Sequence, residues 1–313
     1  TMFDVIPEYM FAGCTSLVDF VPINSTFDKG INLLANISSL GEYAFYNCSA
    51  ITKVGVNTLI TTIPSHCFDG CVKLTRFANV KKTTEEEVDG FFPNEEITKL
   101  DDYAFANCNS FTTITVPSTI TSLGSYVFAN CAKLVSAIIE NNSLATGMFA
   151  NCGIFSSCYI NPQITSVGDD AFKNDSALIH FGFIGEENDA NGLQLNHNLT
   201  SIGANAFYNC NKIGDLNSTN PLVIGQSVKT IGSYAFYGMS LIETFVIPDT
   251  VTSLGEGVMS GWTSLKSITI PFIGASASEN GITGVFGYMF GRAEVSGITP
   301  TNQPYEYNTN ILL

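Results

Sequence analysis

One motif returns along nearly the whole chain, and it restricts the fold more than any other feature. The clearest copies are residues 231–248 and 123–139, which place an aromatic anchor five residues after their start. The anchors are Phe11, Phe45, Phe68, Phe105, Phe128, Phe149, Phe172, Phe207 and Phe236, with Met259 in the same slot. Their spacing fits a unit of about 23 residues with insertions, which is the signature of a solenoid. We therefore expect one elongated array, although 313 residues would be enough for two globular domains.

The residues around each anchor predict a short helix. The position two residues after it is always glycine or asparagine, which tolerate the left-handed backbone of a helix C-cap. The position three residues before it is almost always acidic or a capping residue, as expected at a helix N-terminus. A helix of one to two turns between these positions is too short to persist alone. Packing of the anchor must therefore hold it.

A period of two follows each predicted helix. In residues 113–116, 244–247 and 267–270 the large apolar residues recur at every second position, which predicts a half-buried strand. A shorter apolar pair in 164–167 and 251–254 predicts a narrow second strand on the other side of each unit. Stacked units would form an α/β solenoid of about ten repeats, with a parallel sheet on one face and short helices on another. The insertions 80–96 and 184–198 are expected to leave it as loops.

The nine cysteines fall into the columns of this repeat. Seven follow an anchor by three residues, namely Cys14, Cys48, Cys71, Cys108, Cys131, Cys152 and Cys210. Cys67 directly precedes an anchor, and Cys158 lies in a strand column. Cysteine behaves as a small apolar residue when buried. All nine are therefore expected to be buried, and most of them to be reduced and inert.

Composition and motifs exclude several function classes. The net charge of −15 argues against nucleic acid and anionic membrane as partners, because phosphate binding needs clustered lysine and arginine. No apolar run is as long as a membrane span, so no membrane insertion is expected. His66, Cys67 and Cys71 lack a fourth ligand at zinc-site spacing, and no catalytic motif is present. We expect no metal, no cofactor and no enzymatic activity. The chain starts with Thr1-Met2 and without a visible signal peptide, which is typical of an excerpt or a mature fragment.

The repeat also resembles a known family. The consensus of the repeat is Leu-x-x-Ile-x-Ile-Pro, as in residues 265–271, followed in the fuller copies by x-x-Val-x-x-Ile-Gly-x-x-Ala-Phe-x-x-Cys. This combination, over about residues 3–271, resembles the BspA-type (Treponema-type) leucine-rich repeat, and 272–313 resembles a partial repeat or cap. The resemblance implies one leucine-rich-repeat solenoid domain over residues 1–313. It also implies a secreted or cell-surface protein of bacteria or some protists, with a role in adhesion.

The outward strand positions are the candidate binding surface, because they vary between repeats while the buried columns stay constant. With the two phenylalanines of the first insertion, they are Lys53, Arg76, Phe91, Phe92, Thr113, Thr115, Ser136, Tyr159, His180, Asp215, Asn217, Thr244, Ser267 and Thr269. The favoured function is a non-enzymatic, monomeric interaction or adhesion protein that binds a host or microbial protein, or a glycan. A passive spacer or stalk is the alternative, and a glycan-binding or glycan-cleaving module is a third reading.

Overall fold

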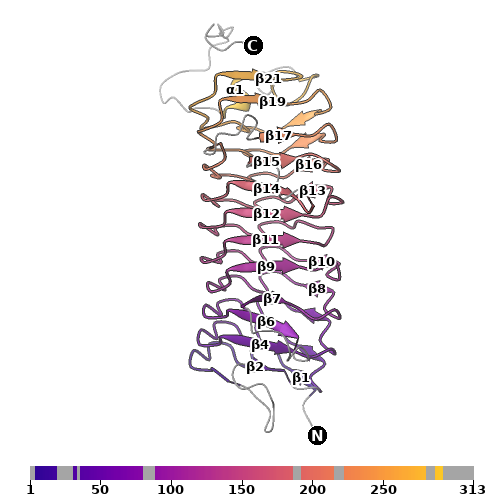
Figure 1. Cartoon of the computed structure of the whole chain (residues 1–313), viewed down its shortest axis with the longest axis vertical. Helices are drawn as coiled ribbons and strands as arrows, with labels where there is room; N and C mark the ends of the chain where they lie inside the picture. The colour runs from indigo at the N-terminus through magenta and orange to yellow at the C-terminus, as the bar shows by residue number, and fades with distance from the viewer. Residues whose placement is uncertain are drawn as a thin grey trace.

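The computed structural model describes residues 4–19, 31–33, 36–79, 89–185, 192–214, 222–279 and 286–291. Its strands run parallel and stack above one another in an elongated coil (Figure 1). Ten of them form the main sheet, in which spatial order follows chain order. They are β2 (Ile31–Asn32), β4 (Lys53–Val56), β6 (Arg76–Asn79), β7 (Gly90–Phe92), β9 (Thr113–Val116), β11 (Ser136–Ile139), β12 (Ser157–Ile160), β14 (His180–Phe183), β15 (Gly192–Leu195) and β17 (Leu222–Ile224).

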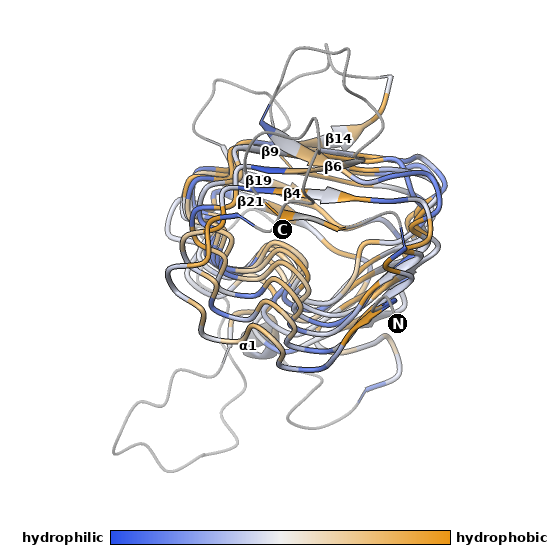
Figure 2. Cartoon of the chain, turned by 90° about the horizontal axis from the view of Figure 1, so that it is seen from below, coloured by the Kyte–Doolittle hydropathy of each residue, from blue (hydrophilic) through white to orange (hydrophobic). Residues whose placement is uncertain are grey.

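Shorter strands form a second ladder. They are β1 (Val5–Ile6) with β3 (Ser39–Leu40), then β5 (Thr62–Ile63), β8 (Lys99–Leu100) and β10 (Ser122–Leu123), then β13 (Ser166–Val167), β16 (Ser201–Ile202), β18 (Thr230–Ile231) and β20 (Ser253–Leu254). The pair β19 (Thr244–Val246) and β21 (Ser267–Thr269) lies beyond β17. Viewed along the coil, the main strands form one wall and α1 (Phe286–Met289) lies at the opposite wall (Figure 2). Both predicted strands of the repeat are thus confirmed.

Strand register explains why alternate residues are buried. Ala137 of β11 pairs with Ile114 of β9 and with Cys158 of β12, and all three point into the coil. Successive strand residues point to opposite faces, so the residues on either side of each inward one face outward. The apolar columns of neighbouring strands thus merge into one continuous core.

The anchor phenylalanines form the centre of this core. Phe68, Phe105, Phe128 and Phe149 are fully buried and stack in sequence, with ring centroids 5.5, 5.7 and 6.0 Å apart. Offset stacking at such distances is favourable beyond the burial of apolar area. Each anchor therefore stabilises the units before and after it.

The segments around the anchors are turns, so the predicted short helices are wrong. Along each turn, one backbone N–H donates to the next unit and the following N–H donates within the turn. Phe45 N donates to Cys67 O of the next unit at 2.9 Å, whereas Tyr46 N donates to Tyr43 O of the same turn at 3.0 Å. A helix would satisfy these amides internally, but here half of them hold neighbouring rungs together. The four-residue α1 is the only helix among the described residues.

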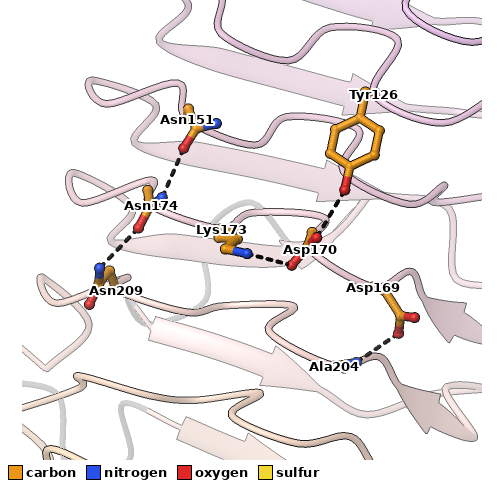
Figure 3. Close-up of polar contacts among 8 residues, drawn as sticks. All are labelled: Tyr126, Asn151, Asp169, Asp170, Lys173, Asn174, Ala204 and Asn209. Atoms are coloured by element: carbon orange, nitrogen blue, oxygen red, sulfur yellow. Dashed lines mark hydrogen bonds and ion pairs between the residues drawn. The ribbon is translucent and has the colours of Figure 1, made fainter.

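The left-handed position after each anchor is confirmed. Asn47, Asn107 and Gly70 have φ values of 57°, 58° and 79°, and every other copy also has a positive φ. The acidic position before each anchor acts differently from the prediction. Asp169 Oδ1 accepts a hydrogen bond from the N–H of Ala204, its equivalent in the next rung, at 2.7 Å (Figure 3). These side chains therefore join rungs instead of capping a helix.

Two predicted loops contain strands of the main sheet. β7 lies inside the insertion 80–96 and β15 inside the insertion 184–198, while residues 80–88 and 186–191 lie outside the described residues. The turn 64–71 bonds directly to the turn 101–108, since His66 N donates to Asp102 O at 3.0 Å. Both β6 and β7 lie between these turns in the sequence. The main sheet thus contains two strands between two turns that are direct neighbours in the stack.

The cysteine column is a ladder of hydrogen-bond donors. The thiols of Cys71 and Cys108 donate to the anchor carbonyls of the preceding rung, Phe45 and Phe68, both at 3.3 Å. Eight of the nine free cysteines are buried, as expected. Cys14 is exposed, which contradicts the prediction, because no described rung precedes its own.

The coil continues past the last anchor. Leu254 N donates to Ala275 O at 2.8 Å, and Met259 N donates to Met289 O at 2.9 Å. Residues around Ala275 and Met289 therefore stack on the final unit as the next rung would. No helix in the described part of the chain is both long and apolar enough to cross a membrane.

Candidate interaction surface

The outer faces of the main sheet and of the β19–β21 pair carry most of the predicted binding residues. Thr113, Thr244, Thr269 and Phe92 are exposed. Lys53, Arg76, Thr115, Ser136, Tyr159 and Ser267 are partly buried, as side chains lying on a sheet between neighbours are. Parallel pairing places Lys53 beside Arg76, and Ser136 beside Thr113. The sheet therefore brings these predicted residues together on one face.

Phe91 and Phe92 do not form the exposed loop that the sequence suggested. Phe91 is fully buried, with its ring 5.1 Å from Phe105 and 5.2 Å from Phe128. Phe92 is 42% exposed, and its ring covers Gly90, where a Cβ would lie 2.8 Å from the ring edge. Strand alternation separates the neighbours, so Phe91 cannot contact a partner whereas Phe92 can.

His180 also departs from the prediction, because it is buried although it occupies an outward strand position. Its imidazole lies 4.8 Å from the ring of Tyr159 on β12. It also leans over Gly182, where a Cβ would come 3.0 Å from Nε2. The missing side chain at Gly182 leaves room for the imidazole beside Tyr159. His180 thus supports Tyr159 instead of facing solvent.

The sequence reading missed an apolar column on this face. Ile138 lies in register between Thr115 and Tyr159 and is 41% exposed, and Val246 of β19 is 58% exposed. Neither is among the predicted binding residues, because both are apolar. The pairing register places Ile138 in the outward column of Phe92, since Ile138 pairs with Thr115 and Phe91 pairs with Ile114. We call Phe92, Thr115, Ile138 and Tyr159 the outer column.

Asp215 and Asn217 lie outside the described residues, so nothing places them on this face. Their assignment to the binding surface stays a prediction.

A ridge of polar and aromatic groups runs along the turns. Asn174 Nδ2 donates to Asn151 Oδ1 at 2.8 Å, and Asn209 Nδ2 donates to Asn174 Oδ1 at 2.9 Å (Figure 3). Nearby, Tyr126 donates its hydroxyl to Asp170 Oδ2 at 2.9 Å, and Lys173 binds the other carboxylate oxygen at 3.1 Å. The asparagine and tyrosine side chains bond between rungs, and the Lys173–Asp170 ion pair lies within one rung. The ridge therefore stabilises the stack.

His66 belongs to the same ridge. Its ring stacks between Tyr43 and Tyr103, at 4.6 and 4.7 Å, and its Nδ1 lies 2.7 Å from Asp69 Oδ2. The described residues include no group of three or more histidine, cysteine, aspartate or glutamate side chains placed to hold a metal ion. Cys67 and Cys71 point into the core instead of joining His66, and burial raises the pKa of both thiols.

An open groove of about 660 Å³ follows the short strands β13, β16, β18 and β20. Gly168, Gly203, Gly232 and Gly255 line it. A Cβ on Gly203 would lie 2.5 Å from Asp169 N, and the other three meet neighbouring backbone just as closely. Close approach of the rungs requires these glycines, so the groove is a by-product of stacking.

Comparisons with known proteins agree with this architecture. A family model described as a BspA type leucine rich repeat region matches in six copies, over residues 1–91, 84–188 and 186–290. No curated protein matches the chain. The count of about ten repeats of 23 residues is not confirmed, because the family model divides the chain differently.

Three solved bacterial structures are similar to the chain at low identity. A leucine-rich repeat protein from Bacteroides ovatus is 20% identical, covers 86% of this chain and 70% of its own, and has a TM-score of 0.41. A leucine rich cell surface protein from Faecalibacterium prausnitzii is 18% identical, with a TM-score of 0.39. The match covers 85% of this chain and 82% of that protein. The pneumococcal vaccine antigen PcpA is 17% identical, with a TM-score of 0.49. The match covers 81% of this chain and 66% of PcpA. The family model spans most of the residues, and by that match the chain belongs to the BspA-type leucine-rich repeat family.

Proposed function

We propose that this chain is a non-enzymatic, extracellular or cell-surface module that binds a protein partner through the outer face of its main sheet. The outer column carries the proposal. Phe92 and Ile138 are each about two-fifths exposed, and both lie in the register of Tyr159. Aromatic and aliphatic anchors surrounded by polar groups are the usual centre of a protein interface.

The polar surroundings support the same reading. Thr113 and Ser136 flank the column along β9 and β11, and they supply hydroxyl groups that can donate and accept hydrogen bonds. The sheet holds the outer column and the neighbouring polar column of Thr113 and Ser136 at a fixed spacing, about 4.8 Å from strand to strand. A rigid surface of this kind loses little conformational entropy when it binds. Membership of a repeat family whose structural neighbours include a cell surface protein supports the location.

The experiment compares whole-chain variants in binding to immobilised extracellular-matrix preparations and to intact bacterial cells. A triple variant, Phe92→Ser, Ile138→Ser and Tyr159→Ser, is expected to lose at least tenfold in apparent affinity. The control carries Leu59→Ser and Ile154→Ser, which remove two exposed apolar residues from outside the described strands. Equal binding by both variants would favour a passive spacer or stalk.

A catalytic role needs a separate test. Incubation with a panel of glycans is expected to give no turnover. Hydrolysis that a single carboxylate substitution abolishes would replace the proposal with a glycan-cleaving function. One solenoid domain over residues 1–313, acting as a monomer, stays part of the proposal. Sedimentation of the full chain would test it.

A further inference from the structure

One position of the cysteine column holds an acid. Asp175 follows the anchor Phe172 by three residues, the place that Cys152 occupies one rung earlier and Cys210 one rung later. Its side chain is fully buried. An ionised carboxylate without a cationic partner is costly in such a place, so buried acids usually take up a proton.

The other rungs hold uncharged groups at this position, including the buried Met239, which has no proton to donate. The thiols of Cys152 and Cys210 donate to the carbonyls of Phe128 and Phe172, at 3.4 and 3.2 Å. In the last rung the indole Nε1 of Trp262 donates to Phe236 O at 2.7 Å. These groups are uncharged donors. An ionised carboxylate has no proton to donate, whereas a neutral carboxylic acid has one.

The contacts of Asp175 agree with a neutral acid. Oδ1 accepts a hydrogen bond from Cys152 N at 2.8 Å, and Oδ2 has no hydrogen-bond partner among the described residues. The titratable groups that face it are Cys152 and Cys210 from the adjacent turns and Cys158 from β12. All three are buried thiols whose pKa burial raises, and no cation of the described part forms an ion pair with Asp175.

We propose that Asp175 is a buried proton-binding site, held as a neutral acid in the folded chain, and that it makes the stack pH-sensitive at the rung 168–175. Opening of the coil there would hydrate the carboxyl group and release its proton to solvent. The site thus couples a proton to the contact between this rung and the rung 145–152, whose Cys152 N–H donates to the carboxyl group.

The direction of the pH effect follows from burial. Desolvation raises the pKa of Asp175 well above its ordinary value, and the neighbouring Cys152 adds to the shift. The folded chain therefore binds the proton more tightly than the unfolded chain, whose carboxyl titrates near pH 4. Its stabilising effect is complete below about pH 4 and is lost as pH rises toward the folded pKa.

The test measures urea unfolding of the full chain between pH 4 and pH 8 for the wild type, Asp175→Asn and Asp249→Asn. Asparagine keeps the shape and a donor but cannot ionise. The unfolding constant of the wild type, relative to Asp175→Asn, is expected to rise up to tenfold per pH unit. Asp249 is exposed, so Asp249→Asn should follow the wild type. Parallel curves for the wild type and Asp175→Asn would overturn the proposal.

A second variant and a direct measurement keep the test decisive. Asp175→Cys restores the thiol of the other rungs and should also remove the pH dependence, which covers the case in which asparagine does not fold. The infrared difference spectrum of wild type minus variant at pH 6 should contain the carbonyl band of a protonated carboxyl group. A carboxylate band in its place would refute the assignment.

Discussion

Replacing Phe91 and Phe92 by alanine, one at a time, tests the register of β7 with two adjacent residues. Phe91 is fully buried, and its ring contacts those of Phe77, Phe105 and Phe128. Removal of a buried phenylalanine ring costs about 3–5 kcal/mol, through lost transfer energy and the cavity left behind. We expect Phe91→Ala to fall in the upper part of this range, because stacked rings on neighbouring rungs cannot easily close the gap.

Phe92 should behave differently because its ring already faces solvent. Since 42% of its surface is exposed, Phe92 buries little more than half of the area that a core phenylalanine buries, and its ring lies over Gly90. Full burial of such a side chain contributes about 1.5–3 kcal/mol. We therefore expect Phe92→Ala to cost about 1 kcal/mol. The two variants should differ in unfolding free energy by at least about 2 kcal/mol.

Urea unfolding followed by circular dichroism measures both values. The single tryptophan, Trp262, lies in the last anchored rung and reports separately on the far end of the coil. Coincident transitions from the two signals would justify one unfolding free energy for the whole array. Equal losses for the two variants, or a larger loss for Phe92→Ala, would refute the register and return both residues to a loop.

Three further predictions concern the ladders. Gly203→Ala should destabilise the chain by at least about 2 kcal/mol in urea unfolding, because its Cβ would lie 2.5 Å from Asp169 N; a neutral effect would show that the rungs can separate there. A thiol reagent should label one cysteine, Cys14, in the folded chain and all nine cysteines after denaturation. The other thiols are buried, and burial raises their pKa, which for Cys48 reaches about 11. Rapid labelling of a second thiol would contradict the buried column. Tyr126→Phe, which removes the hydrogen bond to Asp170, should lower the unfolding free energy by about 1 kcal/mol, and a loss above about 3 kcal/mol would give the ridge a larger role.

Sequence periodicity predicts the core of this fold well, because each column is repeated many times. The anchor phenylalanines, the left-handed positions after them and both strands of the repeat follow from patterns that recur along the chain. The helices were wrong for a physical reason. Residues such as Asp169 suit a helix N-terminus, but an acceptor at the same place can equally bind the N–H of a neighbouring rung. A sequence pattern does not distinguish a local partner from a stacked one.

The candidate surface could be predicted only in part. Thr113 and Thr244 were found because polar strand residues alternate with apolar ones. Ile138 was missed because an apolar residue in a strand is normally assigned to the core, and Phe91 was misplaced because a strand inside an insertion has no repeat context. The position of His180 depends on Gly182, two residues away on the same strand. Such local packing leaves no periodic signal.

The extra strands β7 and β15 affect the shape of the molecule. Each adds about 4.8 Å to the wall formed by the main sheet, while the turns opposite stay in direct contact. Two walls of unequal length can stay joined only if the longer one splays or arches. We therefore expect each insertion to bend the coil locally, and we expect removal of one to straighten the coil without deleting an anchor.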